Sequence, residues 1–259
     1  MVKVLHRSGQ SEKDGTAQLF RIVKVDLAAF HVIHIYWSKS IHFVKIVKKF
    51  QTNLIFSIKI NMFVSEKLSP EKMHLHTGGA IGSDSYFEKL AIEMDFKVSA
   101  YSYKTKRHTS CNKVEITDEQ YEEGRRMIIE ANRIMKRSRI ERYMNLLARN
   151  WFQVKNSDQV FAVGEIMFKG HRPSQMVDLV SGGTGYAHAL SMISGTPFFI
   201  FDQKLESWYE WSFISERFIR IERPSITKTD FAGIGTRDLN PIGEREIRGL
   251  FDRLCLSSY

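Results

Sequence analysis

Cysteine is scarce in this chain of 259 residues, which contains only Cys111 and Cys255. Neither cysteine has another Cys or a His at the spacing of a zinc site. Two isolated thiols do not form a disulfide framework and are typical of a reducing compartment. The sequence therefore predicts neither a disulfide scaffold nor a metal site, and it suggests no bound cofactor.

Long apolar runs are also absent. The stretch 27–64 is rich in Ile, Val and Phe, but lysines interrupt it every few residues, so no run of about 18 uncharged apolar residues exists. The first ten residues lack the apolar core that follows the positive charges of a secretory signal. We therefore expect no membrane span and a cytoplasmic protein.

The positive charge is unevenly distributed. Residues 1–70 contain 11 Lys and Arg against 4 Asp and Glu, whereas residues 71–259 contain 27 against 25. The net charge of +9 invites a nucleic-acid partner, but the larger part of the chain is nearly neutral. We predict a poorly specified basic extension at 1–70, with a small added strand pair as the alternative, followed by one domain at 71–259.

From Met73 onward, short apolar strands alternate with helical segments, which is typical of a mostly parallel sheet flanked by helices. The sequence thus predicts an α/β, Rossmann-like fold. A long helix is expected from Thr117 to about Trp151, with a capping box at Thr117 and Gln120, a break near Ser138 and a solvated basic face that includes Arg137. The last helix follows Asn240 as N-cap. The predicted strands are Met73–His76, Lys97–Tyr101, Val160–Val163, Leu179–Val180, Phe198–Phe201 and Asp230–Ala232.

Three glycine-rich turns follow predicted strands: TGGAIGSD at 77–84, SGGTG at 181–185 and AGIGTR at 232–237. In a parallel sheet such turns gather at the carboxyl ends of the strands. Glycine lets the backbone approach a phosphate closely, and the helix that follows presents unpaired N–H groups. The hydroxyls of Ser83, Thr184 and Thr236 and the guanidinium of Arg237 would add donors. One glycine pair often serves only its turn, but three in one sheet favour a phosphate-bearing ligand.

Two common nucleotide motifs are missing. The chain has no GxxxxGK[ST] sequence, which argues against a P-loop, and no GxGxxG sequence, which argues against an ordinary dinucleotide fold.

The segments HTGGAIGSDSYFEKLA, NWFQV, VSGGTGYAHALSMISGTPFFIF and FAGIGTRDL resemble the signature blocks of the SLOG superfamily, especially its DprA-like and Lonely Guy-like members. With their spacers they cover most of residues 73–254. In that family the turn of the GxR type normally comes first, whereas here the turn with Gly235 and Arg237 comes last. The resemblance therefore implies a circular permutation, with the C-terminal strand Asp230–Ala232 inserted beside the strand that leads to Gly78.

The resemblance also implies one pocket. The resemblance does not settle which residue would be catalytic. Lonely Guy phosphoribohydrolases have a Glu where this chain has Ala189 and a Thr where it has Tyr186. Asp84 or Glu165 would then be the acid/base group with Arg237 holding the phosphate, although an Asp at a helix start is also a common cap. His188 is either a further ligand contact or a partly buried helix residue. The pocket residues implied are Gly78, Gly79, Ser83, Asp84, Asn150, Trp151, Gly182, Gly183, Thr184, Gly185, Gly233, Gly235, Thr236 and Arg237.

Three functions follow from these residues. The favoured one is binding of a phosphorylated nucleotide-type ligand, as a sensor or ligand-binding protein. The first alternative is hydrolysis of the N-glycosidic bond of a nucleoside monophosphate. The second is binding of single-stranded DNA through the same turns, which the nearly neutral charge of 71–259 disfavours. The sequence does not distinguish a monomer from a homo-oligomer.

Overall fold

The structure is a computed structural model, and it describes residues 70–256 apart from 106–107, 109 and 172–174. The described residues belong to one compact unit, Glu66–Tyr259. The prediction of a basic extension at 1–70 concerns residues that, Pro70 apart, lie outside the described part of the chain.

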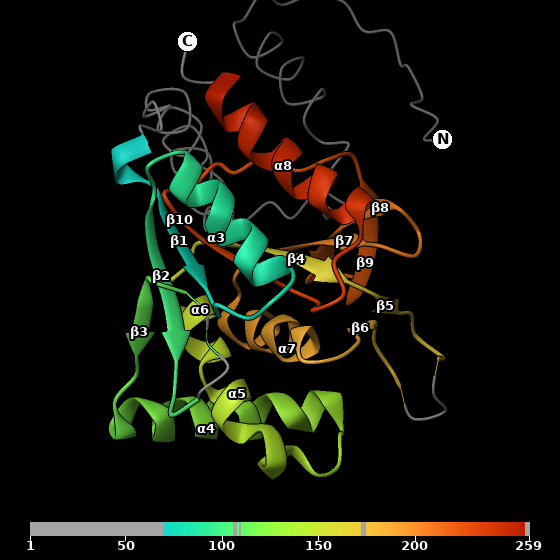
Figure 1. Cartoon of the computed structure of the whole chain (residues 1–259). Coiled ribbons are helices and arrows are strands. Elements are labelled where there is room, and N and C mark those ends of the chain that lie inside the picture. The colour runs from blue at the N-terminus through green and yellow to red at the C-terminus, as the bar shows by residue number, and fades with distance from the viewer. Residues whose placement is uncertain (1–69, 106–107, 109, 172–174, 257–259) are drawn as a thin grey trace, which may run out of the picture. The chain divides into compact units, whose positions relative to one another are not determined.

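An eight-stranded sheet forms the centre of the unit (Figure 1). Six strands are parallel to one another, and the last two form an antiparallel hairpin at one edge. The α/β, mostly parallel architecture that the sequence predicts is thereby confirmed. In spatial order the strands are β3 (Lys113–Glu115), β2 (Lys97–Ser102), β1 (His74–Thr77), β10 (Asp230–Gly235), β4 (Gln159–Gly164), β7 (Phe198–Asp202), β8 (Ser207–Ser212) and β9 (Arg217–Ile221).

The C-terminal strand β10 lies between β1 and β4 and is parallel to both. Its register sets Asp230 opposite His74 and Ala232 opposite His76. The predicted insertion of 230–232 beside the strand leading to Gly78 is therefore present.

Helices cover both faces of the sheet (Figure 1). The side chains of β4 alternate between them: Val160 and Ala162 pack with the helices of one face, Phe161 and Val163 with those of the other. No helix in the described part of the chain has the length and apolar character needed to cross a membrane. One face carries α3 (Ser83–Glu93) and α8 (Pro241–Leu256); the other carries α4 (Asp118–Met135), α5 (Met144–Ala148), α6 (Asn150–Lys155) and α7 (Thr184–Ser194), and two short 3-10 turns lie at Pro70–Lys72 and Ile140–Tyr143.

The predicted helix starts are confirmed. Thr117 accepts a hydrogen bond from the Gln120 amide at 3.2 Å, and the Gln120 side chain accepts one from the Thr117 amide at 2.8 Å. The Asn240 side chain likewise accepts from the Gly243 amide at 2.7 Å. The break expected near Ser138 is also present, because α4 ends at Met135 and Lys136 and Arg139 adopt the left-handed conformation.

Several predictions about strands were wrong or incomplete. β6 (Leu179–Val180) is not in the main sheet, since it pairs antiparallel with β5 (Ile166–Met167) in a separate two-stranded sheet. β10 continues to Gly235, so Gly233 and Gly235 belong to a strand and the third turn begins only at Thr236. The short β3 and the β8–β9 hairpin were not predicted.

Candidate functional site

A cavity of about 530 Å³ lies at the carboxyl ends of β1, β10, β4 and β7. At this place the chain order of the strands reverses, because β1 leads on to β2 and β3 on one side while β4 leads on to β7 on the other. Crevices at such reversal points are where open α/β sheets bind ligands, and the volume is in the usual range for a small-molecule site. Not every residue of the surrounding segments lines the cavity; the lining residues fall within 80–84, 146–150, 164–165, 181–184, 203–204 and 234–238.

All three predicted glycine turns reach this cavity, including the second one, which does not follow a strand of the main sheet. The predicted site residues that line it are Asp84, Asn150, Glu165, Gly182, Gly183, Thr184, Gly235, Thr236 and Arg237.

Three residues of the first turn lie behind the cavity wall. A Cβ on Gly78 would stand 2.6 Å from the Asp84 carboxylate, and one on Gly79 would stand 2.4 Å from the His108 ring. Ser83 is fully buried, and its hydroxyl donates to the Thr236 carbonyl at 2.9 Å. These residues shape the turn and are not in the lining.

Three other predicted residues are also absent from the lining. Gly233 lies under the Phe87 ring, and a Cβ on Gly185 would stand 2.2 Å from the Val180 carbonyl, so both glycines permit close packing. The indole of Trp151 donates to Glu123 of α4 at 2.7 Å. Its expected position at the pocket was wrong, because this tryptophan packs α6 against α4.

Asp84 connects the first turn to the third. Its carboxylate accepts hydrogen bonds from the amides of Gly78, Ala80 and Gly235, the last at 2.9 Å. The side chain is 5% exposed. Burial raises the pKa of Asp84 to about 6, although the Arg149 guanidinium favours the charged form. Three amides of these two turns thus already bind the protein's own carboxylate.

Arg149 was not among the predicted residues. It is 4% exposed, and its guanidinium donates to the carbonyls of Gly78 and Tyr101, the latter at 3.2 Å. Its Nε is buried and has no hydrogen-bond partner among the described residues. The cation therefore compensates the buried charge of Asp84 and forms part of the cavity floor. The only sequence feature that could have indicated Arg149 is its position directly before the block NWFQV, which begins at Asn150.

Within the described residues, the second turn has backbone amides without a hydrogen-bond acceptor at the start of α7. These are the N–H groups of Gly183 and Thr184. A Cβ on Gly182 or Gly183 would meet nothing within 4 Å. Gly182 has a positive φ of 58°, which explains its glycine, but Gly183 has a φ of −61° that any residue adopts. Neither conformation nor packing within the described residues requires glycine at position 183.

Arg137 orients this turn. Its guanidinium donates to the carbonyls of Gly182 and Val180, the latter at 3.0 Å, and lies over the Tyr186 ring at 5.3 Å. Since the two polar groups of a trans peptide point in opposite directions, the Gly183 N–H points away from Arg137. The interpretation of Arg137 as part of a solvated face was therefore wrong: the residue follows the end of α4 and binds the glycine turn.

Charged side chains stand at the mouth of the cavity. Arg237 is exposed and has no ion-pair partner among the described residues. Glu165 and Lys204 form an ion pair at 3.4 Å across the rim. Ile81, 63% exposed, and Leu146, 43% exposed, add apolar surface to the same lining.

The helix after the second turn carries no acid toward the cavity. Tyr186 and Ala189, at the positions where the resembling hydrolases carry Thr and Glu, are both buried in the core. His188 is fully buried among the rings of Phe198, Trp211 and Phe218, with centroids 4.5–5.0 Å away. Burial lowers the pKa of His188 to about 3. This histidine is a core residue and not a ligand contact.

No protein-family model, curated protein or solved structure matches this chain.

Proposed function

We propose that this chain binds a phosphorylated, nucleotide-type ligand in the cavity at the carboxyl ends of β1, β10 and β4. The observation that carries the proposal is the start of α7, where the amides of Gly183 and Thr184 are free and Gly183 has open space in front of it. A helix N-terminus with unpaired amides attracts anions through its N–H groups and its dipole. A side chain at position 183 would occupy the space that a phosphate needs.

Arg237 supplies the second part of the anion site. It lines the same cavity on the loop after β10, and its planar guanidinium suits the oxygens of a phosphate. The exposed side chains of Ile81 and Leu146 offer an apolar surface for a base or ribose. The resemblance of the glycine blocks to the SLOG superfamily supports a nucleotide-type ligand over other phosphates.

A second candidate is hydrolysis of a nucleoside-monophosphate N-glycosidic bond, and the raised pKa of Asp84 favours it. A buried carboxyl in a cavity with a pKa of about 6 has the property of a general acid. Its three backbone hydrogen bonds and its electrostatic interaction with the buried Arg149 support a structural role instead. Binding without hydrolysis is therefore the first proposal.

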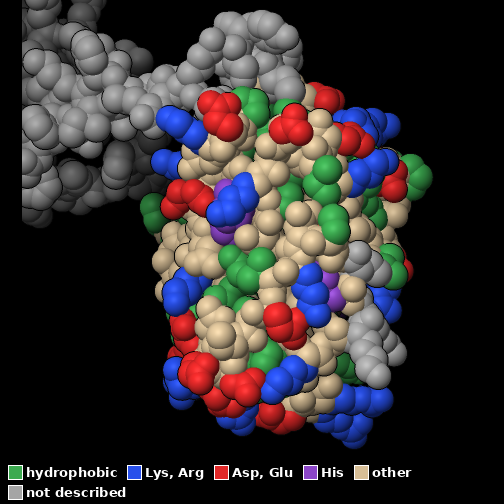
Figure 2. Space-filling model, turned by 60° about the vertical axis from the view of Figure 1, so that its left-hand side comes forward, with side chains coloured by type: hydrophobic (Ala, Val, Ile, Leu, Met, Phe, Trp, Pro, Cys, Tyr) green, Lys and Arg blue, Asp and Glu red, His purple; other side chains and the backbone are tan. Residues whose placement is uncertain are grey.

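A broad nucleic-acid surface has less support. On the face shown in Figure 2, acidic and basic side chains are interspersed and form no single-charge stripe. Binding along a nucleic-acid backbone requires such a stripe.

The test is a thermal-unfolding panel on the full-length chain with nucleoside monophosphates and diphosphates, inorganic phosphate, unphosphorylated nucleosides and a single-stranded oligonucleotide. A ligand at 100 times its Kd stabilises the folded state by about 2.7 kcal/mol. We expect stabilisation by phosphorylated nucleosides and much less by the nucleosides alone. Ribose 5-phosphate release would establish the hydrolase instead, and strongly salt-dependent stabilisation by the oligonucleotide alone would favour DNA binding. No stabilisation by any phosphorylated compound would overturn the proposal.

A further inference from the structure

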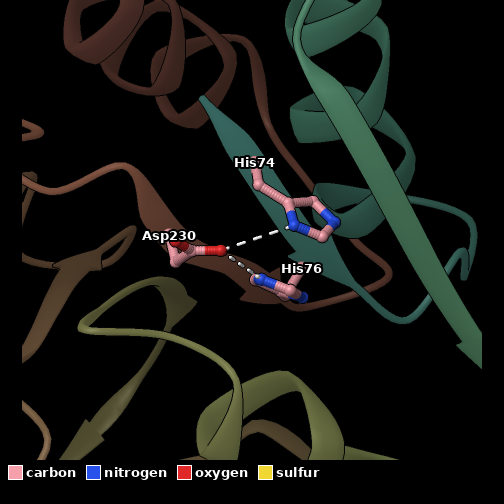
Figure 3. Close-up of side chains that lie close together, drawn as sticks. All are labelled: His74, His76 and Asp230. Atoms are coloured by element: carbon pink, nitrogen blue, oxygen red, sulfur yellow. Dashed lines mark hydrogen bonds and ion pairs between the residues drawn. The ribbon is translucent and has the colours of Figure 1, made fainter. Parts of the chain in front are cut away.

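Two histidines and one aspartate lie close together (Figure 3). They stand at the opposite end of the sheet from the cavity, where β1 and β10 begin. His74 and His76 lie two residues apart on β1, so both side chains leave the same face of the strand. Asp230 begins the neighbouring β10 and pairs with His74 in the register. Asp230 stands five positions before Gly235, so it lies about 16 Å from the cavity end of β10 at a rise of about 3.3 Å per residue.

One ring nitrogen of each histidine faces the same carboxylate oxygen. His74 Nδ1 lies 3.4 Å and His76 Nε2 lies 3.2 Å from Asp230 Oδ1, and the three atoms are all within 4.8 Å of one another. Adjacent ligand atoms around a tetrahedral zinc ion, with bonds of about 2.0–2.1 Å, are roughly 3.3–3.4 Å apart. The two measured separations match that spacing.

The other ring nitrogens are held by neutral hydroxyl groups. His74 Nε2 is 2.9 Å from Ser99 Oγ, and His76 Nδ1 is 3.0 Å from the Tyr101 hydroxyl, to which Asn156 also donates at 2.7 Å. Metal-binding histidines usually donate their second ring N–H to an oxygen acceptor, which fixes the ring and the tautomer. Ser99 and Tyr101 of β2 thus fix the orientation of the two histidine rings on β1.

The cluster has access to solvent through its acidic member. The side chains of His74 and His76 are 16% and 3% exposed, whereas that of Asp230 is 42% exposed. Thr229 donates to the second carboxylate oxygen of Asp230 at 3.1 Å, which leaves Oδ1 turned toward the two rings. An ion would enter past Asp230, and three protein donors leave a coordination position for water.

We infer that His74, His76 and Asp230 bind a divalent transition-metal ion of the class that prefers imidazole, with zinc as the representative. The donor set of two imidazole nitrogens and one carboxylate oxygen suits Zn²⁺, Co²⁺ or Ni²⁺ and not Mg²⁺ or Ca²⁺, which require oxygen ligands. The bound ion would connect the first strand of the described sheet to its C-terminal strand. This site is separate from the cavity and does not depend on its ligand.

The test uses the full-length protein after chelator treatment, titrated with Zn²⁺ and, in parallel, with Mg²⁺. We expect saturable binding of one Zn²⁺ at the cluster, a rise in melting temperature with Zn²⁺ and none with Mg²⁺. His74→Gln and His76→Gln should each weaken this binding at least tenfold. The matched control is His171→Gln, because His171 is exposed and outside the cluster.

Co²⁺ provides a readout that a purely structural role would not change. The cobalt-loaded protein should show the intense visible absorption of a low-coordinate Co²⁺ ion, and His76→Gln should lose it. If that variant does not fold, the Co²⁺ absorption is measured in His74→Gln, whose site is more accessible, and in the near-isosteric Asp230→Asn. Both should lose it. Absence of zinc-dependent stabilisation in the unmodified protein, or zinc binding equal in His74→Gln and His171→Gln, overturns the inference.

Discussion

The carboxylate of Asp84 accepts a hydrogen bond of 2.9 Å from the backbone amide of Gly235, a residue 151 positions later in the chain. This bond joins the start of α3 to the end of the C-terminal strand β10. The same carboxylate binds the amides of Gly78 and Ala80, so it holds the wall of the cavity together from inside. Asp84, which the sequence suggests as an acid catalyst, therefore holds two turns of the site in place.

Replacement of Asp84 should therefore destabilise the fold. In Asp84→Ala three amides lose their acceptor and the buried Arg149 loses its counter-charge, which we expect to cost about 3 kcal/mol of unfolding free energy. Urea denaturation measures this cost. Glu165→Ala is the matched control, because that carboxylate is exposed and its removal should cost about 1 kcal/mol or less. Equal stability of the two variants would contradict the structural role.

Arg237 should matter for the ligand and not for the fold. Because its exposed side chain makes no ion pair within the described part of the chain, we expect Arg237→Ala to leave the melting temperature unchanged without ligand. A charge-assisted bond to phosphate contributes about 1.5–3 kcal/mol, so the Kd for a phosphorylated nucleoside should rise roughly 10- to 100-fold. Isothermal titration calorimetry measures the change. Arg217→Ala, on the distant edge strand β9, should leave the Kd as it is.

The sheet could be predicted from sequence because its central strands are short apolar runs followed by glycines. The insertion of β10 beside β1 was predicted from the resemblance of the glycine blocks to the SLOG superfamily, in which the block that is last here normally comes first. The small strands β3 and β5 were not, because Lys113–Glu115 is exposed and Ile166–Met167 has only two residues. Their pairing depends on tertiary neighbours and not on local pattern.

The glycine turns of the site could be predicted from sequence. The long side chains that contact these turns from other elements could not. Arg137 appears in sequence as a member of a basic helical stretch, and Arg149 lies later in the same predicted helix. The left-handed residues Lys136 and Arg139 break that stretch, and the break brings Arg137 to the second glycine turn. The histidine pair at 74 and 76 was on a predicted strand, but its partner Asp230 becomes visible only once β10 is placed beside β1.

Gly82 tests how closely the first and third turns approach each other. Its φ of 101° and ψ of −130° belong to a region that only glycine adopts readily, and a Cβ there would stand 2.3 Å from the Arg237 carbonyl oxygen. We expect Gly82→Ala to cost about 3 kcal/mol and to weaken ligand binding as well. Gly195→Ala separates strain from collision: its φ is 75° but a Cβ would meet nothing within 4 Å, so about 1 kcal/mol is expected. Denaturation curves that show equal costs for the two variants would argue against the close contact at Gly82.

Gly183 offers the most direct test of the anion site. In Gly183→Asp a carboxylate would project into open space beside the free amides of α7, where it would repel a phosphate and occupy its place. We expect the melting temperature without ligand to be kept, because Asp is a good residue at a helix N-cap. The thermal shift with phosphorylated nucleosides should be lost. Gly183→Ala, which adds only a methyl group, should keep part of the shift; an unchanged shift in Gly183→Asp would remove this turn from the site.

His188 determines part of the response of stability to acid. The pKa of its imidazole is lowered from 6.5 to about 3 by burial among three aromatic rings, and neither ring nitrogen has a hydrogen-bond partner in the described structure. Because the unfolded chain binds the proton first, the folded state loses stability as the pH falls from 6.5 toward 3, by about 2 kcal/mol between pH 7 and pH 5. His188→Leu removes this contribution, so the variant should gain about that amount over the unmodified protein between the same two pH values. Burial also lowers the pKa values of His74 and His76, but both proteins share that effect and it cancels. Urea denaturation at pH 7 and pH 5 measures the unfolding free energy of both proteins. If that free energy changes by the same amount in both, the buried imidazole has a hydrogen-bond partner in solution.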